Sequence, residues 1–175
     1  GMGKTTLAAS AYKNKDVTSH FSCRAWIYVG RTYIKEDLLK SIIQNFYISS
    51  MEESAPSNIR AMDVIGLIDI LRKYLENKSY MVVFDDVWKD EFWADIKHAL
   101  PDNKNGSRLI ITTRNRGVAH FMPASVVHIF KLEGLPLDAA WQLFCKRAFN
   151  GSCPPELEEL SKKIIEKCGG LPLAL

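Results

Sequence analysis

The chain opens with residue types that bind phosphate, in the order Gly1, Met2, Gly3, Lys4, Thr5, Thr6. Glycines let backbone N–H groups curl around an anion in conformations that other residues avoid. Lys4 supplies a catalytic cation beside the outer phosphates, Thr5 a hydroxyl ligand for Mg²⁺, and Thr6 a further donor to a phosphate oxygen. These six residues predict a phosphate-binding loop, and the alternative is a flexible terminus with two chance glycines.

Two adjacent carboxylates follow a buried strand further along the chain. The apolar run 80–84 ends abruptly at Asp85 and Asp86. Ligands bind at the carboxyl ends of strands in open α/β sheets. We therefore expect Asp85 to hold Mg²⁺ through a water, since Mg²⁺ keeps much of its hydration. Asp86 is a candidate catalytic residue that positions or polarises the attacking water. The alternative is a polar turn that merely ends the strand.

Another apolar segment also ends in polar side chains. Residues 109–111 lead into Thr112, Thr113 and Arg114. A guanidinium group suits an outer phosphate, so the loss of that phosphate would be felt through Arg114. An arginine that caps a strand end at the surface is an equally good interpretation of the chemistry.

The pattern of apolar residues predicts the elements that must position these groups. Strands are expected over residues 24–29, 80–84, 107–113 and 126–130. Residues 1–12 are expected to form a glycine-rich turn that runs into a helix, and further helices are expected over 34–47, 62–75, 91–100, 138–149 and 155–168. Residues 14–19 and 49–58 are expected to be turn and loop. Strands alternate with helices up to about residue 130 and helices follow. We predict an α/β domain over 1–130 and the beginning of a helical domain over 131–175.

Composition excludes several classes of protein. The net charge is +3, and the lysines and arginines form no run, so no direct binding of nucleic acid is expected. The four cysteines form no metal-ligand pattern and are expected to be reduced thiols in a cytoplasmic protein. No apolar run is long enough for a transmembrane segment.

These segments, in this order, resemble the NB-ARC nucleotide-binding domain of plant disease-resistance proteins, among the signal-transducing P-loop ATPases. The resemblance is carried by six blocks, at residues 1–8, 24–29, 81–88, 106–114, 132–144 and 168–175. Trp88 and the segment 24–26 are similar to the coiled-coil class rather than the Toll-like class. The resemblance implies that Thr113 and Arg114 sense the nucleotide and that Pro172 packs near the adenine.

The resemblance also implies a fold and a function. The fold would be a P-loop NTPase parallel sheet with flanking helices, whose first strand and first loop residues precede Gly1. The function would be a switch that rests with ADP and exchanges it for ATP, with hydrolysis so slow that it serves as a reset. Coiled-coil and leucine-rich-repeat domains and self-association are implied for the full-length protein. Residues 1–175 by themselves are expected to bind nucleotide poorly.

Three other interpretations remain open from the residues. An ordinary metabolic ATPase of the same superfamily would often carry a glutamate where Asp86 stands. An apoptotic or bacterial regulator would share the same core. A scaffold with a dead site is disfavoured by the intact Lys4, Thr5 and Asp85.

Overall fold

The chain forms two compact units. The computed structural model describes residues 1–51, 54–120, 122 and 127–175. One unit, Thr5–Ile129, contains the sheet and is called the sheet unit below. The other, called the helical unit, comprises Phe130–Leu175 together with Gly1–Lys4. The predicted phosphate loop is thus divided, because Gly1–Lys4 group with the C-terminal residues rather than with the sheet.

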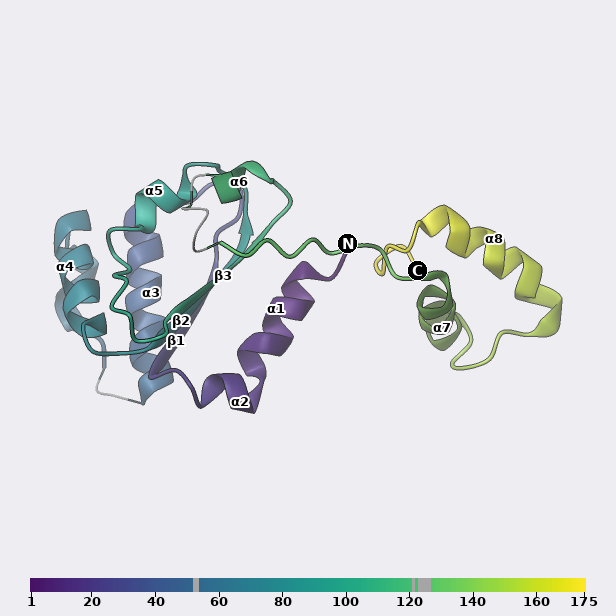
Figure 1. The fold of residues 1–175 in the computed structure, drawn as a ribbon, viewed down its shortest axis with the longest axis horizontal. Helices are drawn as coiled ribbons and strands as arrows, with labels where there is room; N and C mark the ends of the chain where they lie inside the picture. Colours follow the sequence, from purple (N-terminus) through teal and green to yellow (C-terminus); the bar gives the residue numbers. More distant parts are fainter. Residues whose placement is uncertain (52–53, 121, 123–126) are drawn as a thin grey trace. The chain divides into compact units, whose positions relative to one another are not determined.

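A parallel sheet lies at the centre of the sheet unit (Figure 1). Among the described residues it has three strands, β1 (Cys23–Tyr28), β2 (Tyr80–Val87) and β3 (Arg108–Thr113), in the order β1-β2-β3. Cys23 pairs with Tyr80 and Tyr28 with Asp85, so β1 and β2 run in the same direction and end together. The predicted α/β fold with a parallel sheet is confirmed, and all three strands deliver their carboxyl ends to one edge.

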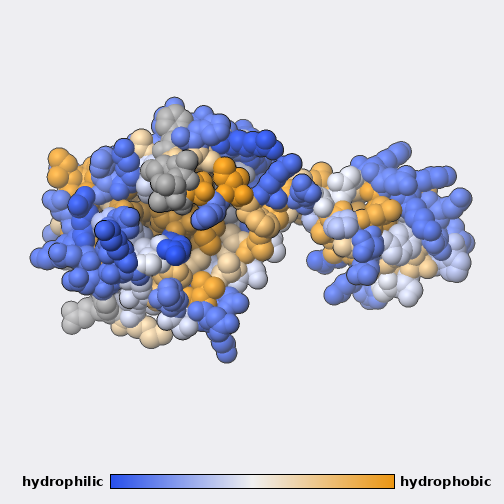
Figure 2. Space-filling view, in the orientation of Figure 1, coloured by the Kyte–Doolittle hydropathy of each residue, from blue (hydrophilic) through white to orange (hydrophobic). Residues whose placement is uncertain are grey.

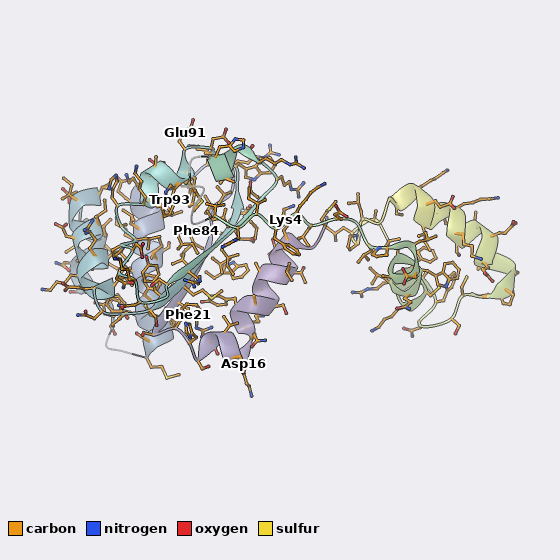
Figure 3. All side chains as sticks on the ribbon, in the orientation of Figure 1. Lys4, Asp16, Phe21, Phe84, Glu91 and Trp93 are labelled. Atoms are coloured by element: carbon orange, nitrogen blue, oxygen red, sulfur yellow. The ribbon has the colours of Figure 1, made fainter. Side chains whose placement is uncertain are left out.

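The central strand β2 is buried on both faces, as its unbroken apolar run predicted. Val82 and Phe84 join the larger core, beneath the helices α3 (Lys35–Ser50), α4 (Val64–Leu75) and α5 (Phe92–Ile96) (Figures 1 and 3). Met81 and Val83 point to the opposite face, where they pack with Ala8 of α1 (Lys4–Lys13). This alternation follows from the period of two along a strand.

Strand β3 is less buried than its sequence predicted. Leu109, Ile110 and Ile111 are only partly buried, because β3 is paired with β2 on one side and forms an edge of the sheet among the described residues. Apolar side chains gather on the face of the sheet unit where α1 and β3 lie (Figure 2). The strand predicted over 126–130 is wrong for residues 127–130, which have no regular structure, while Val126 lies outside the described residues.

Side-chain caps mark the beginning of two helices, α2 and α4. Helix α4 begins after Asp63, whose side chain accepts a hydrogen bond from the Gly66 N–H at 2.9 Å. A one-turn helix, α2 (Lys15–Thr18), occupies the expected turn because the Asn14 side chain caps it. The loop predicted over 49–58 is shorter than expected, since α3 continues to Ser50. A 3₁₀ turn, η1 (Ser57–Ala61), precedes α4, and α6 (Gly117–His120) follows β3.

The helical unit consists of α7 (Leu137–Ala148), η3 (Pro155–Leu157) and α8 (Glu158–Cys168). Helix α8 ends at Gly169, which has the left-handed φ of 56° that favours glycine at this position. The Leu135 N–H, just before α7, donates to the Gly170 carbonyl at 2.7 Å, so the segment after α8 is joined to the segment before α7. The structure describes all four cysteines and shows no disulfide bond among them. In the part of the chain that is described, no helix is long and apolar enough to cross a membrane.

Leu71 and Ile65 provide a matched test of this core within α4. Leu71 is fully buried, whereas Ile65 is 69% exposed. Leu71→Ala is expected to lower the free energy of unfolding by about 2–5 kcal/mol, because it removes buried methyl groups and leaves a cavity. Ile65→Ala should change it by less than about 0.5 kcal/mol. Urea denaturation measures both values, and equal losses would contradict the assignment of the α4 core face.

Candidate functional site

A buried carboxylate at the end of β2 organises the site. The Thr5 hydroxyl, in the first turn of α1, donates a hydrogen bond to Asp85 Oδ1 at 2.8 Å, across 80 residues of sequence. Asp85 is only 6% exposed. The two residues predicted to hold Mg²⁺ are therefore in direct contact. A buried carboxylate needs such donors, because losing its hydration is costly.

Thr112, near the end of β3, is a second donor to the same oxygen and was not among the predicted site residues. Its hydroxyl donates to Asp85 Oδ1 at 2.6 Å and accepts a hydrogen bond from the Asp86 backbone N–H at 2.9 Å. Thr112 thus links the Asp85 carboxylate to the backbone of Asp86. Its position two residues before Arg114, at the polar end of a predicted strand, could have identified it as a site residue.

Asp86 leaves the regular strand at an irregularity in the sheet. The pairing between β2 and β3 shifts between Phe84 and Val87, and Asp86 has a left-handed φ of 59°. Aspartate tolerates this conformation better than most residues. An extra residue in a strand bends it and redirects the side chains around it. The half-buried Asp86 side chain is consequently placed independently of the Asp85 carboxylate.

The glycine segment has the geometry of an anion-binding turn. Gly3 has a φ of 81°, and no heavy atom lies within 4 Å of the position a Cβ would take. Lys4 follows as the first residue of α1 (Figure 3), and Thr6 is exposed one residue after Thr5. Backbone N–H groups at the start of a helix attract anions. The local conformation therefore suits the phosphate contact predicted for Gly1–Thr6.

Within the helical unit, the first residue lies against the C-terminal segment. A Cβ added to Gly1 would lie 2.9 Å from the Leu173 Cβ. Leu173 directly follows Pro172, which is half-buried and was predicted to lie near the adenine. Gly1 and Met2 are thus near the segment that contains Pro172, while the contact of Pro172 with a base remains a prediction.

Thr113 and Arg114 differ in their surroundings. The Thr113 hydroxyl donates to the Val87 carbonyl at 2.7 Å and accepts from the Asn115 N–H at 2.9 Å, so it closes the turn after β3. Arg114 is exposed, and its Cζ atom lies 5.9 Å from the centre of the Trp88 ring. Of the two predicted sensors, Arg114 has the side chain that is free to reach a phosphate.

Asn115 joins the loops after β2 and β3 and was also missed by the sequence analysis. Its side-chain amide donates to the Trp88 carbonyl at 3.0 Å and to Asp90, and its carbonyl oxygen accepts from the Gly117 N–H at 3.0 Å. A Cβ at Gly117 would lie 2.5 Å from the Asp90 carboxylate oxygens, so glycine is needed there. No motif in the sequence marked Asn115.

The donor set suits a hard cation beside a phosphate. The Thr5 hydroxyl and the Asp85 carboxylate offer oxygen ligands, which Mg²⁺ prefers, and Mg²⁺ usually adds waters and phosphate oxygens to one or two carboxylates. The residues present therefore fit a magnesium-bound nucleotide. Within the described residues, no group of three or more His, Cys, Asp and Glu side chains could hold a metal ion.

Comparison with known proteins places this arrangement in a family. The family profile of the NB-ARC domain matches residues 1–153. The chain is 38% identical to disease resistance protein RPM1 of Arabidopsis thaliana, over 100% of this chain and 19% of that protein. It is 40% identical to the putative disease resistance RPP13-like protein 3 of the same plant, over 100% and 21%.

A relative from another plant shows the same pattern of coverage. A putative late blight resistance protein homolog of Solanum demissum is 34% identical, over 100% of this chain and 14% of that protein. The chain thus spans about a fifth or less of the length of these curated relatives.

The bridging role of Thr112 can be tested with two substitutions. Thr112→Val keeps the shape of the side chain but leaves the Asp86 N–H without its acceptor and Asp85 with one donor fewer. The free energy of unfolding should fall by about 1–3 kcal/mol. Thr112→Ser retains the hydroxyl and should stay close to the original protein. Chemical denaturation decides, and equal stability of the valine and serine variants would refute the bridge.

Proposed function

The chain belongs to the NB-ARC family, and we propose that it is the ADP- and ATP-binding switch of a plant disease-resistance protein. The observation that carries this proposal is the hydrogen bond from the Thr5 hydroxyl to Asp85 Oδ1 at 2.8 Å. It joins the residue after the phosphate-loop lysine to the carboxylate at the end of β2. This is the pair of oxygen ligands that a magnesium-bound nucleotide requires.

Each predicted residue has a role consistent with its position. The backbone N–H groups of Gly1, Met2 and Gly3 and the start of α1 bind phosphate oxygens, with Thr6 as a further donor. Lys4 neutralises charge on the outer phosphates. Arg114, at the carboxyl end of the sheet, distinguishes the presence of the outermost phosphate.

A magnesium ion, when bound with the nucleotide, supplies positive charge that offsets the charge of the phosphates. Thr5 and Asp85 are the residues that would hold it. Asp86 orients or polarises the water that attacks the outermost phosphate. Pro172 contributes to the adenine contact.

The energetics of a switch set a requirement on these contacts. A nucleotide shifts a conformational equilibrium only by its difference in affinity for the two states. Moving a population from 1:99 to 99:1 takes roughly 5.5 kcal/mol. Charge-assisted hydrogen bonds contribute about 1.5–3 kcal/mol each, so a few contacts to one phosphate are sufficient. In the proposed cycle ADP marks the resting state, ATP the active state, and slow hydrolysis restores rest.

We extend this proposal to the full-length protein that contains this domain. The relatives named above are disease resistance proteins several times longer than this chain. We expect coiled-coil and leucine-rich-repeat domains beside this one, self-association on activation, and a cytoplasmic location. A metabolic ATPase is the competing function, and steady turnover of ATP at many molecules per minute would favour it.

Replacing Lys4 tests the nucleotide site directly. In the protein that carries this domain, Lys4→Ala is expected to lower the affinity for ADP and ATP by about 100-fold or more, since it removes the cation beside the phosphates. Lys13→Ala, at the other end of the same helix, is the matched control and should leave affinity unchanged. Mass spectrometry of the nucleotide that co-purifies gives the result. Full retention by the Lys4 variant would rule out this site.

The two aspartates should separate binding from hydrolysis. Asp85→Asn is expected to remove most of the gain in nucleotide affinity that Mg²⁺ provides, because it takes away the carboxylate charge. Asp86→Asn tolerates the left-handed backbone at this position and should slow hydrolysis with little effect on affinity. Equilibrium binding with and without Mg²⁺ and single-turnover hydrolysis measure the two effects. Identical behaviour of both variants would contradict the separate roles.

A further inference from the structure

Trp88 brings together two arginines from different parts of the sheet unit. The Arg31 Cζ atom lies 4.6 Å from the centre of the Trp88 ring, and the Arg114 Cζ atom lies 5.9 Å from it. Both distances are within the range of a cation–π contact. Trp88 follows the end of β2 directly, whereas Arg31 and Arg114 follow the ends of β1 and β3.

The pairing of β1 with β2 places Arg31 at the edge of the sheet where the strands have their carboxyl ends. The Val29 N–H donates to the Asp85 carbonyl at 2.9 Å, so the pairing of β1 with β2 extends past Tyr28. The chain then turns at Gly30, which has a φ of 70° and lies against the Tyr28 ring. Arg31 therefore emerges beside the end of β2 that carries Asp85, and no motif of the sequence analysis had included it.

The backbone carbonyl of Trp88 accepts a hydrogen bond, whereas its ring nitrogen has no hydrogen-bond partner among the described residues. The Asn115 amide donates to the Trp88 carbonyl at 3.0 Å and anchors the residue to the loop after β3. Among the residues that the structure describes, the Trp88 Nε1 atom is a buried side-chain donor without a hydrogen bond. Buried donors of this kind are uncommon in folded proteins.

The two guanidinium groups lack an internal counter-charge. Both arginines are exposed, and in the described part of the chain neither makes a salt bridge or donates a hydrogen bond. A guanidinium that stacks on a ring uses its face and keeps its N–H edges available for a phosphate. Two like charges near one ring repel each other, and an anion between them would relieve that repulsion.

We propose that Arg31 is a second binding residue for the outermost phosphate of a nucleoside triphosphate, paired with Arg114, and that Trp88 is the positioning residue that aligns both guanidinium groups. The inference rests on the nucleotide-binding function proposed above and adds Arg31 and Trp88 to the role proposed there for Arg114. The Thr5–Asp85 contact binds either nucleotide, whereas the arginine pair binds the phosphate that only ATP has.

Equilibrium binding of ADP and of a non-hydrolysable ATP analogue, both with Mg²⁺, tests this in the protein that carries the domain. Arg31→Gln should lower affinity for the ATP analogue by about tenfold or more, the loss expected for a charge-assisted contact, and leave ADP affinity unchanged. Arg108→Gln, at the opposite end of β3, is the matched control and should alter neither affinity.

A double-mutant cycle tests the positioning role of Trp88. Trp88→Leu should lower affinity for the ATP analogue selectively, and Trp88→Phe, which keeps an aromatic face, should lose less. Combining Trp88→Leu with Arg31→Gln should cost less than the sum of the two single effects, because part of the effect of Trp88 acts through Arg31. If the leucine variant is unstable, Arg31→Gln and Trp88→Phe still decide.

The outcomes separate this inference from the proposed function. Equal loss of ADP and ATP-analogue affinity in Arg31→Gln, or no loss of either, overturns the role of Arg31 while the nucleotide site stands. Additive effects in the double variant overturn the role of Trp88. Absence of any nucleotide binding by the unmodified protein would instead overturn the proposed function. Lys4→Ala, which should lose affinity for both ADP and ATP, shows what loss of the whole site looks like in the same assay.

Discussion

The site depends on satisfying one buried carboxylate. Asp85 is 6% exposed, and it accepts hydrogen bonds at Oδ1 from the hydroxyls of Thr5 and Thr112. A carboxylate that is removed from water is stable only with such donors. Because the donors come from α1 and β3, satisfying Asp85 also fixes the start of the phosphate-binding helix against the sheet. Stability and the nucleotide binding that we propose therefore share the same contacts.

The parallel sheet explains why the remaining polar groups meet. Parallel strands end at one edge, so Arg31, Trp88 and Arg114 follow the ends of β1, β2 and β3 there. The irregular pairing at Asp86 adds a second carboxylate with its own direction. The Asn115 amide then ties the loop after β2 to the loop after β3. In the function proposed above, Asp85 serves the metal-bearing phosphates and the cluster of Arg31, Trp88 and Arg114 serves the outermost one.

The sequence predicted the kind of most elements and suggested the class of the site. Apolar runs and their periods predicted the three strands and their flanking helices, because burial against a core imposes a period of two or 3.6 residues. The glycine–lysine–threonine order and the paired aspartates favoured phosphate and metal binding, since those side chains carry the chemistry themselves, and these ligand roles stay predictions. The contact of Thr5 with Asp85 followed from their expected places at one sheet edge.

Only the tertiary structure decided which groups touch. Thr112 and Asn115 act through hydrogen bonds to residues more than twenty positions away. A threonine or an asparagine has many possible hydrogen-bond partners, and the sequence does not distinguish among them. The expected strand over 126–130 is not formed by residues 127–130, because a strand exists only where a neighbour pairs with it, and β3 was likewise less buried than its apolar run predicted. The contacts of Trp88 with two arginines depend on strand register and a glycine turn, which are set by packing across the sheet.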